Sequence, residues 1–210
     1  MAYNSESDRR PVAARKQRPI VVLADWLVRR GASANAISVA GMLCALAGGA
    51  LLSQAGHPAL WIAAGILIQL RLLANVLDGM VAVGRGIASP TGELFNEIPD
   101  RVSDTAFFVG VGIASGQAWL GCAAALAAMA TAYIRAVGRG LGQQSDFSGP
   151  MAKQHRMALL TALCLFCAFA PADWTSRAPE TVLYVILALT TLTAARRLLR
   201  LAAALRRNAR

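Results

Sequence analysis

The segments Asn75-Val-Leu-Asp78-Gly79-Met-Val-Ala82-Val83 and Gly92-Glu-Leu-Phe-Asn96-Glu-Ile-Pro-Asp100 place polar and acidic groups inside a strongly apolar chain. Hydrophobic residues make up 56% of the 210 residues and charged residues only 15%, whereas an ordinary globular domain carries about 25% charged residues. This composition predicts an integral membrane protein. Carboxylates in or beside a membrane are costly, so those between Asp78 and Asp104 are candidate functional groups.

The apolar residues form continuous runs rather than alternating patterns, which favours helices over the strands of a membrane barrel. We expect an all-α membrane protein with about six transmembrane helices in one domain. Several runs are shorter than the roughly 20 residues that cross a bilayer, so flanking polar turns should extend the helices. The runs cover residues 36–53, 59–83, 105–120, 121–137, 157–170 and 181–195.

Polar and basic segments flank this membrane domain. We assign residues 1–18 to a basic N-terminal tail, 19–200 to the membrane domain and 201–210 to a basic C-terminal tail. The segment 19–31 shows two faces at helical spacing, which predicts an amphipathic helix lying along the membrane interface. These faces consist of Ile20, Leu23, Ala24 and Leu27 on one side and Asp25, Arg29 and Arg30 on the other.

The basic residues indicate an orientation. Of the 21 Lys and Arg residues, seven lie before residue 35 and six lie from Arg196 to Arg210. The positive-inside rule then places both termini, and the acidic window with them, on the cytoplasmic side. A net charge of +10 also occurs in nucleic-acid-binding proteins, but basic tails beside apolar spans bind anionic membrane lipid more simply. We therefore expect membrane lipid and no nucleic acid as a partner.

The spacing of the polar residues in the acidic window predicts where they meet. Asn75 and Asp78 are three residues apart and share one helix face, whereas Asn96, Asp100 and Asp104 are four apart and share another. Two helices can thus present these oxygens to one point, where a hard divalent cation would hold a diphosphate. The alternative for any one of these residues is that it only caps a helix at the interface.

The window resembles the signature of the CDP-alcohol phosphatidyltransferases, D-x2-D-G-x2-A-R-x8-G-x3-D-x3-D. This chain has N-x2-D-G-x2-A-V-x8-G-x3-N-x3-D, with identical spacing from Asn75 to Asp100. The segment from Gly31 to Ser38 also looks like the family's approach to its first transmembrane helix. The resemblance covers about residues 20–200 and implies a bundle of about six helices with cytoplasmic ends.

The family's known site implies roles for these positions. Asp78 would be a metal ligand for Mg²⁺ or Mn²⁺, with Asn75, Asn96 and Asp100 at the other ligand positions, and Asp100 would also be the general base. The family signature further implies that substrate lies against Gly79, Ala82 and Gly92. An acceptor pocket beside the fourth and fifth helices would use Arg135, Arg139, Lys153 and Arg156, although these residues also fit ordinary positive-inside charge.

The chain departs from the signature at three positions. Asn75 and Asn96 replace aspartates, which removes two negative charges and should weaken metal binding. Val83 stands where the signature has an arginine. Arg85, two residues later, could supply the missing positive charge. Glu93 or Glu97 could compensate for the lost carboxylates.

Two functions follow from the resemblance. The first is a phospholipid-biosynthetic transferase that moves a phosphatidyl group from a CDP-alcohol such as CDP-diacylglycerol to a small polar alcohol, phosphorylated or not, and releases CMP. The alternative is a catalytically inactive member that binds CDP-lipid or acts as a membrane scaffold. The resemblance and the basic ends suggest the bacterial inner membrane, and related enzymes are often homodimers.

Overall fold

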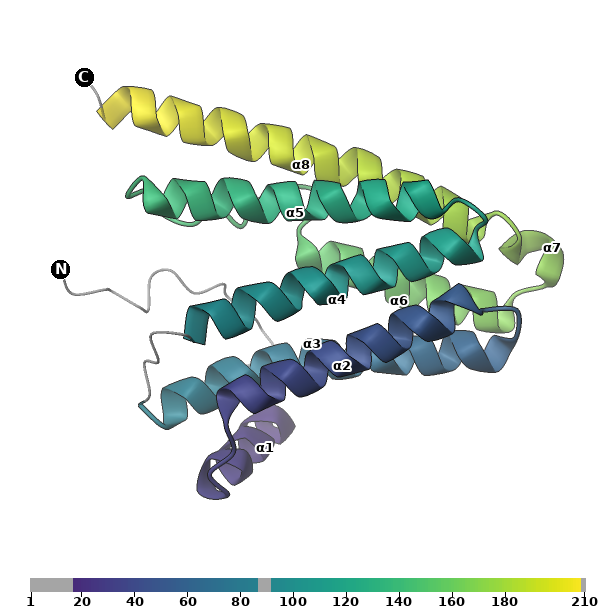
Figure 1. Cartoon of the computed structure of the whole chain (residues 1–210), viewed down its shortest axis with the longest axis horizontal. Coiled ribbons are helices and arrows are strands. Elements are labelled where there is room, and N and C mark those ends of the chain that lie inside the picture. Colours follow the sequence, from purple (N-terminus) through teal and green to yellow (C-terminus); the bar gives the residue numbers. More distant parts are fainter. Residues whose placement is uncertain (1–16, 87–91, 209–210) are drawn as a thin grey trace.

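A computed structural model describes residues 17–86 and 92–208 of the chain, and within these ranges the fold consists of helices and connecting turns. Six long helices run side by side, and two short ones lie at the edges (Figure 1). The helices are α1 (Arg18–Arg29), α2 (Ala34–Ser53), α3 (Pro58–Gly84), α4 (Gly92–Ala114), α5 (Ala118–Gly140), α6 (Lys153–Phe169), α7 (Ala172–Thr175) and α8 (Ala178–Asn208).

Four segments are long and apolar enough to cross a membrane: Ala34–Ser53, Pro58–Gly84, Ala118–Gly140 and Asp173–Asn208. Two long helices do not reach that standard. The first half of α4 carries the acidic window, and α6 has only 17 residues. Because the 141–152 segment packs against the middle of α8, α6 begins part-way along the bundle (Figure 1). The structure therefore shows an all-helical protein with four candidate membrane spans.

Most predicted helices coincide with observed ones, but one boundary was wrong. The sequence predicted a break between residues 120 and 121, whereas α4 ends at Ala114 and α5 begins at Ala118. Gly116 makes the turn with a φ of 71°, a left-handed conformation that glycine adopts without strain. The residues Ser115, Gly116 and Gln117 mark this turn in the sequence, and the predicted limit lies a few residues beyond them. At the other end of the chain, α8 continues through Asn208, into the predicted C-terminal tail.

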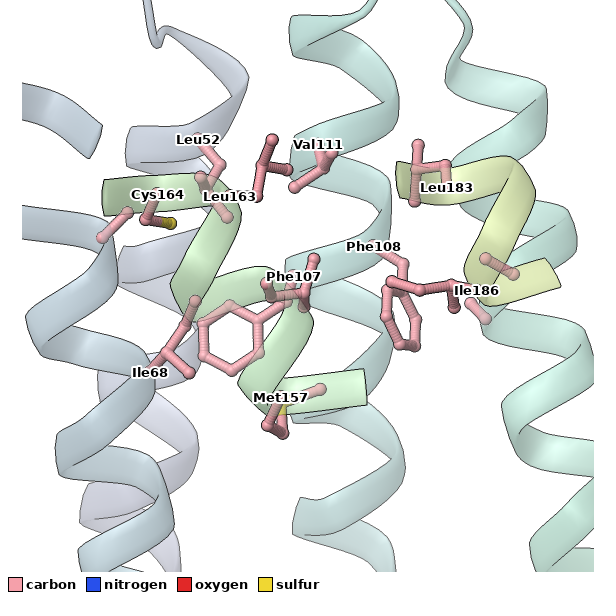
Figure 2. Close-up of a cluster of buried hydrophobic side chains, with 14 of the residues drawn as sticks. Leu52, Ile68, Phe107, Phe108, Val111, Met157, Leu163, Cys164, Leu183 and Ile186 are labelled. Carbon is pink, nitrogen blue, oxygen red and sulfur yellow. The ribbon is translucent and has the colours of Figure 1, made fainter. Parts of the chain in front are cut away.

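The core lies in the middle of the bundle, where all six of the long helices contribute large side chains, several of which Figure 2 shows. Phe107 and Phe108 of α4 are fully buried there, between Ile68 of α3, Met157 of α6 and Ile186 of α8. Helix α4 thus runs through the centre of the packing. Its depth in the bundle is what positions the acidic residues in its first half.

Glycines let α2 and α4 approach closely. A Cβ on Gly49 would lie 2.4 Å from the Ala106 carbonyl oxygen, and a Cβ on Gly110 would lie 2.4 Å from the Gly49 oxygen. Such contacts are typical of small residues at membrane helix interfaces. Because Gly49 and Gly110 let the two backbones pack closely, they fix the register of α4 against α2.

The first helix packs against α3 at the end where the acidic window lies. Val28 of α1 contacts Gly84, and Arg85 donates hydrogen bonds to the carbonyl oxygens of Gly31 and Ala32 at 3.1 and 2.9 Å. Ser33 caps α2 by accepting a hydrogen bond from the Ala36 amide. Arg85 is therefore engaged with the turn after α1.

Candidate functional site

One cavity of about 1290 Å³ contains all the residues that the sequence nominated for the site. Helices α3, α4, α5 and α6 contribute to its wall, and α1, α2 and α8 complete it. The structure thus brings the two halves of the signature and the basic residues of α5 and α6 to one place. The nominated residues are Asn75, Asp78, Gly79, Ala82, Gly92, Asn96, Asp100, Arg135, Arg139, Lys153 and Arg156.

Asp78 projects from α3 and is 6% exposed. Its Oδ2 atom accepts a hydrogen bond of 2.6 Å from the hydroxyl of Ser38 on α2, which is itself buried. Ser38 also donates toward the Ala34 carbonyl oxygen at 3.2 Å. A neutral hydroxyl therefore orients this carboxylate, and the part of the chain that the structure describes places no cation within ion-pair distance of it.

Asp100 projects from α4 and has a different set of partners. Its Oδ1 atom accepts hydrogen bonds from Arg71 Nη2 at 2.6 Å and from Asn75 Nδ2 at 2.7 Å. Lys153 of α6 forms a close ion pair with the same oxygen. One carboxylate oxygen thus receives two cations and an amide from two different helices. Charge-assisted contacts of this kind are stronger than neutral hydrogen bonds.

Arg71 was not singled out from the sequence. It lies on α3 one turn before Asn75, is 1% exposed, and donates from Nε to Ser103 Oγ at 2.8 Å. Ser103 in turn donates to the Pro99 carbonyl oxygen at 2.6 Å. The signal for its importance is its place inside the apolar run 59–83, because a buried charge in a membrane helix is costly unless it is paired.

A small residue on α2 makes room for this arginine. A Cβ on Gly41 would lie 2.9 Å from Arg71 Nη1 and 2.7 Å from the Cβ of Ala74. Arg71 does not line the cavity and lies behind Asp100. Its Nη1 atom and the Oδ1 atom of Asn75 are both buried without a hydrogen-bond partner among the described residues.

A second ion pair lies one turn further along α4. Arg156 of α6 donates to Asp104 Oδ2 at 3.1 Å and to the Met151 carbonyl oxygen at 3.0 Å. Asp104 and Arg156 are 3% and 2% exposed. Lys153 lies between the two pairs, with its Nζ 4.0 Å from Asp104 Oδ1. The start of α6 is thus tied to α4 by two basic residues in successive turns.

The basic residues of α5 face Glu97, another acidic residue of the window. Glu97 forms a close ion pair with Arg135 and lies 3.8 Å from Arg139 and 3.6 Å from Arg101. The guanidinium of Arg135 also stacks over the Phe147 ring at 5.1 Å. Glu97 therefore organises the arginines of the predicted acceptor pocket.

The other residues at which the chain departs from the signature lie in different surroundings. Asn96 lines the cavity with an exposed side chain. Val83 is 51% exposed, and Arg85, which was considered as a replacement for the missing arginine, bonds to the turn after α1. The predicted turn at 84–92 lies mostly outside the described residues, and so does the Glu93 side chain.

The charged side chains of the cavity differ from the ligands that a divalent cation requires. Seven basic side chains and three carboxylates line it, and the described residues contain no cluster of three or more His, Cys, Asp or Glu side chains placed to hold a metal ion. Mg²⁺ requires several oxygen ligands that are free to coordinate, whereas Asp100 Oδ1 already accepts three donors. These side chains do not fit the divalent-cation site that the resemblance implies.

The fold and the cavity together define a helical membrane protein whose site suits an anionic ligand beside two carboxylates. The model of the CDP-alcohol phosphatidyltransferase family matches residues 32–205, which is most of the chain. The protein belongs to this family of transferases.

Two curated relatives match part of the chain. One is the inner membrane protein YnbA of Escherichia coli, 33% identical over 84 residues that cover 40% of this chain and 42% of that protein. The other is the archaetidylinositol phosphate synthase of Aeropyrum pernix, 30% identical over 102 residues that cover 49% of this chain and 53% of the relative. Each match thus spans about half of the relative or less.

Solved structures share the fold over most of its length. The Mycobacterium tuberculosis phosphatidylinositol phosphate synthase with CDP-DAG bound superposes with a TM-score of 0.75 at 20% identity, covering 88% of this chain and 94% of that one. The same enzyme with manganese and citrate gives a TM-score of 0.74 at 19% identity, covering 87% and 88%. At these identities the similarity shows a common fold.

Proposed function

We propose that the protein transfers a phosphatidyl group from a CDP-activated lipid, such as CDP-diacylglycerol, to a small polar alcohol and releases CMP. The observation that carries this proposal is the convergence of both halves of the signature and a group of basic side chains on one cavity. In the proposed orientation, six helices cross the bacterial inner membrane, α1 lies at the interface, and the cavity and both termini face the cytoplasm.

In the reaction, the acceptor hydroxyl oxygen attacks the phosphorus that carries the lipid alcohol. The bond from that phosphorus to the bridging oxygen breaks, and CMP leaves with that oxygen. We assign general-base catalysis to Asp100, whose Oδ1 is held by Arg71, Asn75 and Lys153. Its Oδ2 then receives the proton of the hydroxyl, a task that requires hydrogen-bond reach to the acceptor.

The acceptor that this cavity suits best is a phosphorylated alcohol. Arg135 and Arg139 lie beside each other on α5 and share Glu97, and arginine forms directional, charge-assisted bonds with phosphate oxygens. Two of the similar proteins reported above are inositol phosphate lipid synthases. Inositol phosphate is therefore the first acceptor to test.

The test is CMP release by the purified protein in detergent with CDP-diacylglycerol. The acceptors are inositol phosphate, glycerol 3-phosphate, serine and choline, and each is assayed in Mg²⁺, in Mn²⁺ and in EDTA. CMP release that depends on one acceptor supports the proposal. Absence of release under every condition would refute it, and CDP-lipid binding without release would favour the inactive, lipid-binding alternative.

Two further expectations remain predictions that simple measurements check. The resemblance implies Mg²⁺ or Mn²⁺ as a cofactor for turnover, whereas the side chains of the cavity do not fit a divalent cation, and the EDTA arm of the same assay decides between the two. A homodimer also follows from the resemblance, and light scattering on the protein in detergent determines its mass.

A further inference from the structure

The arrangement around Asp100 replaces positive charge that the family signature leaves to bound cations. Four aspartates at the signature positions would repel a diphosphate until cations bind between them. In this chain two of the four positions are Asn75 and Asn96. Of the two remaining carboxylates, Asp100 pairs with Arg71 and Lys153, whereas Asp78 accepts a hydrogen bond from Ser38. The charge of Asp100 is thus compensated by side chains of the protein itself.

Asn75 is more than a weakened metal ligand in this geometry. Its Nδ2 donates to the same Asp100 oxygen as Arg71 Nη2, from one turn away on α3. An aspartate at position 75 has no proton to donate and would place a second negative charge beside Asp100. The asparagine and the arginine therefore act together, because both donate a hydrogen bond to the same oxygen of Asp100.

The packing around Arg71 accommodates its guanidinium specifically. Its guanidinium is held by Ser103, has the space left by Gly41, and is almost fully buried. Arg71 does not reach the cavity, so it acts through Asp100 as a positioning residue. Lys153 lines the cavity and carries its charge to the surface that a ligand touches.

We propose that Arg71 and Lys153 take the place of a divalent cation at Asp100, so that the cavity binds the diphosphate of a CDP-lipid without metal. Lys153 contacts the diphosphate, while Arg71 neutralises Asp100 from behind and allows the anion to approach. Arg135, Arg139 and Arg156 add to the positive charge of the wall. The ligand named here rests on the proposed function, but its binding is measured separately from turnover.

The test is calorimetric titration of CDP into the wild-type protein in detergent, first after exhaustive dialysis against EDTA and then with added Mg²⁺ or Mn²⁺. The expected result is CDP binding in EDTA with a Kd within about threefold of the value in metal. Lys153→Gln should weaken CDP binding about tenfold or more, because a charge-assisted contact is lost. Arg177→Gln, an exposed arginine between α7 and α8 at the other end of the bundle, is the matched control and should leave the Kd unchanged.

Binding of the metal alone gives a second measurement that does not depend on activity. Wild-type protein should not bind Mn²⁺ in the cavity, as measured by electron paramagnetic resonance of the free ion. The variant Arg71→Ala, Asn75→Asp, Asn96→Asp removes the inner cation and restores four carboxylates, so it should gain Mn²⁺ binding and require Mn²⁺ for CDP binding. Mn²⁺ binding equal to that of wild type would count against the proposal.

The outcomes separate this inference from the proposed function. CDP binding that is lost in EDTA and restored by metal would overturn the inference and leave the transferase standing. CDP binding in EDTA without CMP release under any condition would support the inference and refute the transferase. Absence of CDP binding with and without metal would overturn the inference, and the transferase would then stand or fall with CMP release.

Discussion

Asp78 and Asp100 are the two carboxylates that the signature keeps, and their surroundings differ. Asp78 accepts a hydrogen bond from the neutral hydroxyl of Ser38. Asp100, on the neighbouring helix, accepts an amide and two cations on one oxygen. The site is therefore not a uniformly weakened version of the family motif. Asp100 on α4 is surrounded by positive charge, whereas Asp78 on α3 has a neutral hydrogen-bond donor.

The largest expected effect lies at Asp100 itself. Asp100→Asn keeps the shape of the side chain and removes its basicity, so CMP release should fall about 10²- to 10⁴-fold, the range for loss of a general base. Initial rates of CMP release measure the effect. Asp173→Asn, at an exposed carboxylate on α7, is the matched control. Turnover that survives in Asp100→Asn would remove the proposed base.

The next effect compares the supports of the two carboxylates. Arg71→Met breaks a buried ion pair and should lower the free energy of unfolding by about 3 kcal/mol, since Lys153 still faces Asp100. Ser38→Ala removes the hydrogen bond from a neutral donor to the Asp78 carboxylate and should cost about 1.5 kcal/mol, the lower end for a hydrogen bond to a charged group. Thermal unfolding in detergent measures both. Equal losses in the two variants would contradict the difference drawn between the two carboxylates.

A triple variant checks that charge, and not only packing, causes the loss at Arg71. Arg71→Met and Lys153→Met combined with Asp100→Leu remove the carboxylate together with both cations that pair with it, and replacing a complete buried ion group by apolar residues is often neutral or stabilising in proteins. The thermal stability of this variant should therefore exceed that of Arg71→Met alone. A triple variant less stable than Arg71→Met would point to packing.

The same comparison shows what the sequence could predict. The apolar runs predicted the long helices, and the spacing of Asn75, Asp78, Asn96 and Asp100 predicted which of them share a helix face, because both depend on periodicity along one helix at a time. That the two faces would meet was expected from the signature shared with the family. The site residues of α5 and α6 were found through their charge and the resemblance. All of them line the cavity, although their roles stay predictions.

The sequence could not predict the contacts that cross between helices. Arg71 and Asp100 are 29 residues apart, and their pairing depends on the register of α3 against α4. Gly41 looks like any glycine of an apolar helix, yet its space admits a guanidinium. Each of these features depends on packing that has no local signature.

A smaller effect tests the space around Arg71. Gly41→Ala would place a Cβ 2.9 Å from Arg71 Nη1 and 2.7 Å from the Ala74 Cβ, so α2 must shift or the arginine must move. Overpacking of this kind costs about 1–3 kcal/mol. The melting temperature should fall, and the Kd for CDP should rise. Gly56→Ala is the matched control, because nothing lies within 4 Å of its Cβ.

The smallest effect concerns an ion pair between the segment that joins α5 to α6 and the C-terminal part of α8. Asp146 lies between α5 and α6, with Oδ2 3.5 Å from Arg200 Nη1, and the side chains are 33% and 58% exposed. Burial disfavours its charged form, but hydrogen bonds from Ser148 and the nearby charges of Arg197 and Arg200 outweigh burial and lower the pKa of Asp146. Unlike the buried pair at Asp100, this pair is screened by solvent.

The sign of the pH dependence follows from that lowered pKa. A carboxylate with a lower pKa in the folded protein stabilises it above the ordinary value of 3.8, and the contribution disappears as the pH falls through the folded-state pKa. Asp146→Asn should therefore lower the free energy of unfolding near neutral pH by less than about 1 kcal/mol. Melting curves of both proteins over a pH series should converge below pH 3.8. A difference that persists in acid would assign the effect to the shape of the loop, because the charge of Asp146 is then absent from both proteins.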